Sequence, residues 1–400
     1  MHVLVLGAGV VGVTTAYYLA NRGCDVTVID SEGAVASGAS YANAGQLSYS
    51  FTDSLAKPDF FAQLPGLLLG REPGSKVRLD PALIGWGLRF LNQCTSQHAA
   101  ENTIALLRIA MRSGELMQDF LRAVPIEFSH RTAGKLILLT DEKQLQSAQK
   151  SCALKRANGC ETDVLTREET LSIEPTLAGI NEDFIASVYS KDDTIADSFE
   201  FTNKLRSHLE STGRVTFRLG AKVCNIETTQ GRFTTVALEN DTMGADAVVV
   251  CAGVQSTALL KPLGIRLPMY PVRGYSLTLP VADATPSVSY TALRRRMVIG
   301  RIGDSVRIAG FADFVGYRKD ADEQRLQALL QLARDLAPGA ADYEAADCRP
   351  WAGNRPMTPN GRPFVGPSSI NGLYLNTGHG MLGWTLAHAC GADVADAVMR

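Results

Sequence analysis

The sequence lacks the features that mark metal-binding, membrane-spanning and nucleic-acid-binding proteins. Its eight cysteines are scattered and no two stand in a CxxC pair, so neither a zinc site nor a redox dithiol is indicated. The formal net charge of −2 gives no electrostatic reason to expect nucleic acid as a partner. No uninterrupted apolar run reaches the ~20 residues that a membrane-spanning helix needs, and no secretory leader precedes the first motif. We therefore expect a cytoplasmic protein with reduced cysteines.

The chain does contain enough apolar residues for more than one core. It has 400 residues, of which 46% are hydrophobic and 20% are charged. Because one hydrophobic core rarely serves a chain of this length, two domains are predicted.

The N-terminal segment has the pattern of a dinucleotide-binding unit. His2–Leu6 is a short apolar run that predicts a buried parallel strand, and a GxGxxG turn follows it at Gly7–Gly12. Val13–Arg22 then has helical character, and Asp25–Ile29 predicts a second strand. This order of strand, glycine turn, helix and strand predicts a Rossmann-type α/β domain.

Each glycine of the turn has a physical role. Gly7 permits the tight turn, Gly9 lets the backbone approach a pyrophosphate, and Gly12 lets the helix pack closely on the strand. The first helix turn would offer free N–H groups to the phosphates. Asp30, followed by Ser31, stands where an acid accepts hydrogen bonds from a ribose hydroxyl, which argues against the 2′-phosphate of NADP.

Three further segments favour FAD over NAD. Ser37–Gln46 is a loop of small residues that could lie along an extended ligand, instead of a further strand and helix. Ala245–Gly253 predicts a last sheet strand near the pyrophosphate. Gly372–Arg400 reads as strand, glycine-rich turn and helix, so Thr377–Gly380 would bring a second helix N-terminus to the flavin edge that becomes negative on reduction.

The expected cofactor contacts come from both ends of the chain and from the segments between them. They are Gly7, Gly9, Gly12, Asp30, Ser31, Ser40, Asn43, Ala44, Gly45, Gln46, Val223, Gly253, Gly378, His379, Gly380, Met381, Leu382 and Gly383.

These residues belong to longer motifs that carry a family resemblance. The sequence resembles the D-amino-acid dehydrogenases, within the larger D-amino-acid oxidase and glycine oxidase group of flavoproteins. The resemblance implies noncovalent FAD, oxidative deamination of D-amino acids to 2-oxo acids and ammonia, and transfer of electrons to a membrane quinone pool. The matching motifs are Val5–Ala20, Ser40–Gln46, Pro271–Pro280, Gly303–Gly310, Arg349–Gly366 and Leu375–Ala387.

The expected fold is D-amino-acid oxidase-like, with a Rossmann-type FAD-binding domain and an α+β substrate domain that has a large mixed or antiparallel sheet. The FAD-binding domain is predicted to be discontinuous. Its expected segments are 1–50, 195–265 and 345–400, and the substrate domain is expected at 75–194 and 266–344.

Residues 51–74 form an apolar stretch whose role has two interpretations. Ser54–Gly70 contains Pro58, Pro65 and the basic residue Lys57, and the basic residue Arg71 follows it. It is either a loop that covers the active site or a surface that touches a partner subunit or the inner face of the cell membrane, and the family resemblance favours the second.

An arginine is the best candidate to hold the substrate carboxylate, because its planar guanidinium can bind it bidentately. Arg355 matches the position of the substrate-binding arginine in the family motif, and Arg349 is the second choice. Strand alternation puts Arg273 on one face with Tyr275, and we expect Arg273 near FAD. His379 is expected at the isoalloxazine edge.

Tyrosines are further candidates, because a phenol can bind a carboxylate and close a pocket. Tyr275 and Tyr290 are the two proposed at the catalytic site, and Tyr41, Tyr49 and Tyr317 are alternatives.

The substrate and the acceptor stay open at this point. Arg294–Arg296 replaces an acidic-Tyr-Lys stretch of many family members, so it either favours an acidic substrate or forms a solvated hairpin tip. The chain could instead be an oxidase or dehydrogenase of glycine, sarcosine or a D-imino acid such as D-proline or D-hydroxyproline. A non-catalytic FAD-binding subunit and an NAD dehydrogenase are the remaining alternatives.

Overall fold

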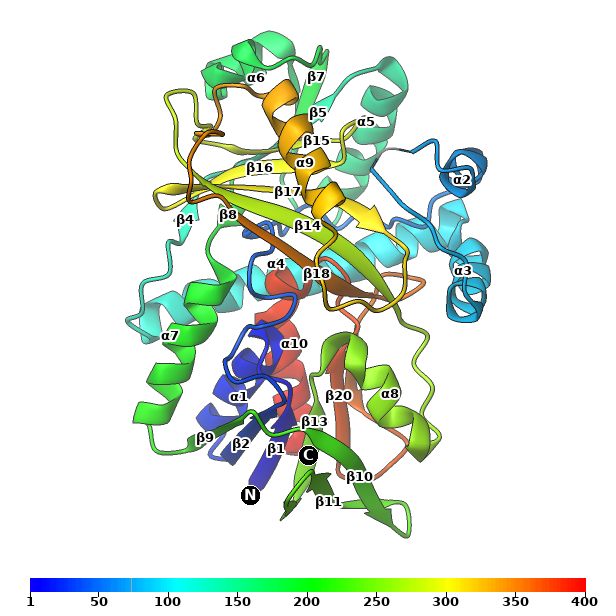
Figure 1. Ribbon diagram of the computed structural model, residues 1–400, viewed down its shortest axis with the longest axis vertical. Helices are drawn as coiled ribbons and strands as arrows, with labels where there is room; N and C mark the ends of the chain where they lie inside the picture. Colours follow the sequence, from blue (N-terminus) through cyan, green and yellow to red (C-terminus); the bar gives the residue numbers. More distant parts are fainter. Residues whose placement is uncertain (73) are drawn as a thin grey trace.

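Two large β-sheets organise the chain, and segments far apart in the sequence build each of them (Figure 1). The computed structural model describes residues 1–72 and 74–400. The first sheet has six strands, all parallel except β19, which runs antiparallel to β20. Their order is β19 (Phe364–Pro367), β20 (Leu373–Thr377), β13 (Ala247–Val250), β1 (His2–Leu6), β2 (Asp25–Asp30) and β9 (Val215–Leu219).

Alternate residues of β1 enter two different cores, as expected for a strand covered on both faces. Val3 and Val5 pack in the core that contains α1 (Val10–Asn21), α7 (Ser198–Ser211) and α10 (Gly383–Val398). Leu4 and Leu6 pack in the core under α8 and a three-stranded sheet. The covering elements are α8 (Ser256–Leu260), β10 (Val223–Thr229), β11 (Arg232–Leu238) and β12 (Thr242–Gly244).

The two ends of the chain meet in the first core. Asn376 Nδ2 donates to Thr15 Oγ1 at 2.9 Å, and the Tyr18 hydroxyl lies 3.0 Å from Nδ1 of His388. These contacts join α1 to β20 and α10, so the opening and closing glycine turns belong to one structure.

The second sheet has eight strands and contains the segments expected in the substrate domain. Neighbouring strands are antiparallel except β15 and β5, which are parallel. Their order is β18 (Arg349–Met357), β14 (Tyr270–Pro280), β17 (Ser305–Asp313), β16 (Met297–Ile302), β15 (Ser289–Ala292), β5 (Lys135–Leu139), β7 (Ala186–Ser190) and β6 (Asp163–Thr166).

The faces of this sheet have different neighbours. Leu277 and Ile308 lie on the face packed against α9 (Glu323–Leu336). Ser276 lies on the other face, where its Oγ donates to the carbonyl oxygen of Ala42 in the loop after β2. The second face therefore looks toward the nucleotide-binding unit.

The boundary expected at residue 345 differs from the structure. The sequence predicts that 345–400 belongs to the FAD-binding unit, but β18 pairs with β14 along Arg349–Met357 and so belongs to the eight-stranded sheet. We propose that the C-terminal part of the nucleotide-binding unit begins after Met357.

The remaining elements connect or flank the sheets. Two consecutive helices, α3 and α4, are separated at Cys94, because the Thr95 side chain caps a new helix there. The apolar stretch around Pro65 contains helix α2. The bounds are α2 (Phe60–Leu68), α3 (Pro81–Gln93), α4 (Ser96–Ala123), α5 (Glu142–Arg156), α6 (Arg167–Ile173), β3 (Gln46–Leu47), β4 (Arg131–Thr132), β8 (Thr194–Ile195) and the 3₁₀ turns Pro175–Gly179, Gly253–Gln255 and Lys261–Leu263.

Candidate active site

The opening turn needs glycine for reasons visible in its neighbours. Gly7 has a φ of +112°, and a Cβ there would lie 2.6 Å from the carbonyl oxygen of Cys251 at the end of β13. A Cβ at Gly12 would overlap the carbonyl oxygen of Gly7. The space in front of Gly9 is bounded by the Ser40 Oγ, which would lie 3.3 Å from a Cβ there. The backbone is therefore open at the point where a pyrophosphate would approach.

In the described part of the chain four helices, α1, α2, α8 and α10, begin without a side-chain cap, and α1 and α10 are the two predicted to face the cofactor. Helices α3 to α7 and α9 are each capped by an Asp or Thr side chain. Helix α1 begins after Gly9 and α10 after Leu382, and neither residue gives a side-chain hydrogen bond. Uncapped helix N-termini suit the phosphates and the reduced flavin edge.

Asp30 is tied to the opening turn. Its Oδ2 accepts from the backbone N–H of Ala8 at 2.7 Å, and its Oδ1 accepts from that of Glu32 at 2.9 Å. Burial raises the pKa of the carboxyl. Two acceptor positions of the carboxylate are in use, which leaves capacity for a ribose hydroxyl. Ser31 follows Asp30 in the chain. The backbone N–H of Ala221 donates to the carbonyl oxygen of Asp30, and Val223, two positions later, begins β10.

The loop after β2 lies between the nucleotide-binding unit and the eight-stranded sheet. Ser40 Oγ accepts from the backbone N–H of Val10 at 3.0 Å. Arg307 of β17 donates to the carbonyl oxygen of Asn43 at 2.7 Å, and Asn43 Oδ1 accepts from Gly45 N. Ala44 lies between Asn43 and Gly45, and the Gln46 side chain donates through Nε2 to Ser289 Oγ of β15. These contacts fix the segment expected to run along the flavin.

The closing turn meets strand β18. Gly378 and Gly380 have φ values of +82° and +57°, and the N–H of Gly380 donates to the carbonyl oxygen of Pro356 at 3.0 Å. His379 is buried, and its Nε2 has no hydrogen-bond partner among residues 1–72 and 74–400. Burial lowers the pKa of His379 to about 4, so its imidazole is neutral at pH 7. A ligand at the turn could satisfy this nitrogen.

The residues present fit FAD. The open glycine turn, the uncapped N-termini of α1 and α10 and the unpartnered His379 nitrogen each match one part of an extended flavin nucleotide. Met381, Leu382 and Gly383 complete the turn and the first residue of α10, although the Met381 side chain is exposed.

Arg355 lies on the sheet face that looks toward the nucleotide-binding unit. Its Nη1 donates to the carbonyl oxygen of Phe311 at 2.9 Å, and within the described ranges it forms no ion pair with a carboxylate. Burial lowers the pKa of the guanidinium, and Asp313 opposes that shift. An arginine stays cationic in either case. A half-buried cation without an acidic partner suits a substrate carboxylate.

Two glycines that face each other across β14 and β18 make room for this arginine. Gly274 pairs with Gly353. The Arg355 guanidinium occupies the space where a Gly274 side chain would stand, and the Trp351 indole occupies that of Gly353. Trp351 and Arg355 thus lie on one face of β18, on either side of Gly353.

The expected role of Tyr275 and Tyr290 at the substrate needs correction. Both are buried in the core on the α9 face of the sheet, opposite to Arg355. The Tyr275 hydroxyl donates to Asp313 Oδ2 at 3.0 Å, and the Tyr290 hydroxyl has no partner among the described residues. Burial raises the pKa of both phenols. Their sheet position keeps them away from the cofactor side.

The other candidates are also separated from Arg355. Arg273 shares the α9 side with Tyr275, contrary to expectation, and donates to the backbone carbonyls of Lys319 and Asp320. Arg349 lies at the other end of β18, in a separate pocket.

The alternative tyrosines are distributed over the molecule. Tyr41 packs on Phe199 and is exposed, Tyr317 is exposed on a loop, and Tyr49 packs over Gly114 of α4.

Sequence reasoning missed Trp351, Phe311 and Ser276. A glycine inside a strand often marks a close approach of another group. The glycines at positions 274 and 353, each inside a predicted strand, therefore indicated that large side chains lie against the backbone there. These side chains are those of Arg355 and Trp351.

Comparison with known proteins identifies the family of the chain. Residues 2–397 match the family described as FAD dependent oxidoreductase. A relative named D-amino acid dehydrogenase 2, from Ralstonia nicotianae, is 39% identical over 100% of this chain and 97% of its own length. Glycine oxidase from Geobacillus kaustophilus has a similar fold, with a TM-score of 0.78 and 21% identity over 100% of this chain and 94% of that one.

L-proline dehydrogenase from P. horikoshii superposes with a TM-score of 0.73 and 20% identity, over 99% of this chain and 92% of that one. At these identities the two structures show the fold, and the family match with the full-length relative shows the family. The chain belongs to the family of FAD-dependent oxidoreductases and is an enzyme of that kind.

Proposed function

We propose that the protein is an FAD-dependent D-amino-acid dehydrogenase that converts small D-amino acids to 2-oxo acids and ammonia. The observation that carries the proposal is the guanidinium of Arg355, which forms no ion pair with a carboxylate in the described part of the chain. It lies on the strand whose Pro356 carbonyl oxygen accepts a hydrogen bond from Gly380 of the closing turn. When bound, FAD supplies the acceptor for a hydride from the substrate Cα. The full-length relative named as a D-amino acid dehydrogenase supports the same reaction.

The residues of the chain bind and orient the substrate. Arg355 binds its carboxylate, and the guanidinium position over Gly274 fixes where Cα lies. The Trp351 indole covers the backbone at Gly353, and we expect it to exclude water from that side of the substrate site. His379 stays neutral because burial lowers its pKa, so it places no positive charge beside the amine.

Substrate choice is the point that most needs a test. Glycine, sarcosine and D-imino acids such as D-proline stay as alternatives, because the fold is shared with a glycine oxidase and a proline dehydrogenase. Anaerobic bleaching of the flavin absorbance against matched D- and L-amino acids is expected to be fast with small D-amino acids. Faster bleaching by glycine or sarcosine would reassign the substrate, and stoichiometric peroxide formed in air would make the enzyme an oxidase.

We further propose that electrons pass to a membrane quinone, and that α2 and α3 bring the enzyme to the bilayer surface. Both helices are apolar on their outer faces, and Arg89 is the only charged residue within their bounds. Leu88 is 66% exposed. The exposed apolar side chains of this surface are Phe61, Leu68, Leu69, Leu79, Ile84 and Leu88.

Helix α3 packs beside the candidate site, because Trp86 contacts Val272 and Met357, which share the sheet face of Arg355. Trp86 of α3 is buried, and its Nε1 donates to the carbonyl oxygen of Met357 at 2.9 Å, two residues beyond Arg355. An enzyme that rests on these helices would hold its flavin site near the lipid. Among the described residues, no helix is long and apolar enough to cross a bilayer, so the proposed contact is peripheral.

Flotation of the holoenzyme with anionic vesicles tests the contact. Leu69→Ser and Leu88→Ser together are expected to lower the bound fraction several-fold and to leave dye reduction by the soluble enzyme unchanged. Ile185→Ser is the control, because Ile185 is an apolar and exposed residue outside these helices. Equal flotation of all variants would overturn the membrane proposal.

A further inference from the structure

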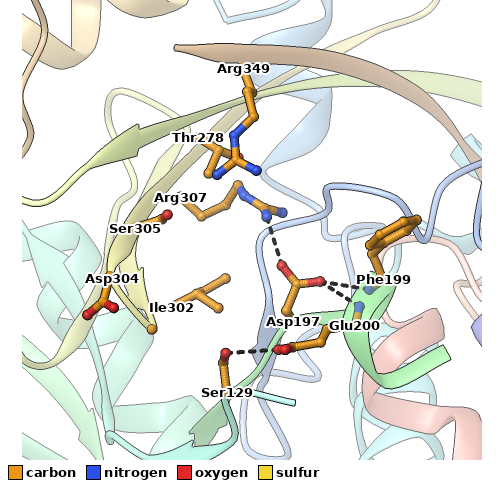
Figure 2. A pocket seen from close by; sticks show the side chains of 11 residues that line it. Ser129, Asp197, Phe199, Glu200, Thr278, Ile302, Asp304, Ser305, Arg307 and Arg349 are labelled. Atoms are coloured by element: carbon orange, nitrogen blue, oxygen red, sulfur yellow. Dashed lines mark hydrogen bonds and ion pairs between the residues drawn. The ribbon is translucent and has the colours of Figure 1, made fainter. Parts of the chain in front are cut away.

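A second polar pocket lies on the cofactor-facing side of the eight-stranded sheet, at the end remote from Arg355 (Figure 2). Its volume is about 290 Å³, which is enough for a small amino acid. Arg349 and Arg355 stand six positions apart on β18, and a strand rises ~3.3 Å per residue, so the two sites are ~20 Å apart. The pocket is therefore separate from the proposed substrate site.

One wall of the pocket is basic. Arg307 is 6% exposed, and its Nη2 lies 3.1 Å from Asp197, while its Nε has no hydrogen-bond partner in the described part of the chain. Arg349 points into the pocket beside it (Figure 2). Its backbone pairs with Thr278 in the sheet, but within residues 1–72 and 74–400 the Arg349 side chain has no hydrogen bond or ion pair. Asp197 neutralises one guanidinium, and the second remains uncompensated.

The opposite wall is acidic. Glu200, in the first turn of α7, accepts from Ser129 Oγ at 2.9 Å, and its second oxygen is 3.9 Å from Lys204 Nζ. Asp304, at the turn between β16 and β17, adds a second carboxylate to the lining. The hydroxyl of Thr278 lies on the basic wall with Arg349 (Figure 2).

We propose that this pocket is a second binding site for a free amino acid, with the carboxylate on Arg349 and the ammonium group directed to Glu200. A zwitterion is the small ligand whose charges match both walls, because a simple anion would face the carboxylates of Glu200 and Asp304, and a simple cation would face the uncompensated guanidinium of Arg349.

Occupation of the site would reach the flavin loop through one residue. Arg307 donates to the carbonyl oxygen of Asn43, in the loop that joins the nucleotide-binding unit to the sheet. A carboxylate on Arg349 changes the field at Arg307 and hence the strength of this hydrogen bond. Binding of an amino acid at this site would therefore change the hydrogen bonding of the loop expected to run along the flavin.

Anaerobic titration calorimetry of the holoenzyme with 2-aminoisobutyrate tests the proposal. This amino acid has no hydrogen on Cα and cannot be oxidised there, so binding is measured without turnover. Arg349→Gln is expected to remove one binding event, to leave dye reduction at low substrate unchanged and to abolish a small shift of the flavin spectrum. Arg108→Gln, at an exposed arginine of α4, is the matched control and should retain that event.

Two outcomes would overturn the inference. One is a binding isotherm that Arg349→Gln leaves unchanged. The other is pyruvate binding to the same site as tightly as 2-aminoisobutyrate, which would make it a simple anion site. Failure of the proposed dehydrogenase function is distinguishable, because it would remove the binding event that depends on Arg355 and leave the one that depends on Arg349.

Discussion

The guanidinium of Arg355 lies against the α-carbon of Gly274 on the neighbouring strand, in the space that a side chain at position 274 would need. This relationship makes the carboxylate-binding geometry depend on two strands, β14 and β18, and on the absence of one methyl group.

Removal of the arginine should weaken substrate binding directly. Arg355→Ala is expected to raise KM for the amino acid about 100-fold, the equivalent of the ~3 kcal/mol that a charge-assisted bidentate contact contributes. Arg355→Lys should recover part of the loss, because it keeps the charge without the planar fork. Steady-state kinetics with a dye acceptor measures both. An unchanged KM in the alanine variant would show that the carboxylate binds elsewhere.

Gly274→Ala should displace the same group without removing it. The added Cβ overlaps the end of a flexible side chain, so the strand can persist while the guanidinium moves. We expect KM to rise about 10-fold with little change in the midpoint of thermal unfolding. Gly87→Ala, where a Cβ would meet no atom within 4 Å, is the control for adding a methyl group.

Asp30→Asn should separate the ribose contact from the support of the turn. An asparagine oxygen can still accept from the N–H of Ala8, but it is a weaker partner for a ribose hydroxyl. The dissociation constant for FAD is expected to rise about 10-fold, as measured by flavin fluorescence during dialysis. Cofactor retention equal to that of the unmodified protein would argue against the ribose role.

His388 predicts a pH dependence of stability. Burial lowers its pKa to about 3, whereas an unfolded histidine titrates near 6.5. As pH falls from about 6.5 toward 3, His388 is protonated in the unfolded chain but stays neutral in the folded chain. The free energy of unfolding therefore decreases over that pH window. His379 acts in the same direction down to about pH 4.

Asp193 opposes this trend, because burial raises its pKa to about 6 and protonation then favours the folded chain. The comparison must therefore be between variants and not within one profile. His388→Gln is expected to show a smaller loss of urea midpoint between pH 7 and pH 5 than the unmodified protein. Parallel profiles for the two proteins would contradict the assignment.

Local sequence was sufficient for the opening turn and for the closing turn. Each is a continuous strand, turn and helix whose glycines act on their immediate neighbours, as Gly12 does on Gly7. The family comparison confirmed the fold class and the cofactor type.

The face of a strand could not be assigned in the same way. Alternation along Pro271–Pro280 correctly separates Tyr275 from Ser276, but it does not say which face the nucleotide-binding unit covers. That depends on α9, which begins 43 positions beyond Pro280, at Glu323, and packs over Tyr275. A larger separation in sequence, of 271 positions, hid the approach of Trp86 to Met357.

The contact between Tyr18 and His388 spans 370 positions, so α10 completes the packing of α1. During synthesis, the surface of α1 that packs on α10 stays uncovered until the ribosome has made α10. Nascent chains that stop before α10 should therefore remain sensitive to protease and bind chaperones.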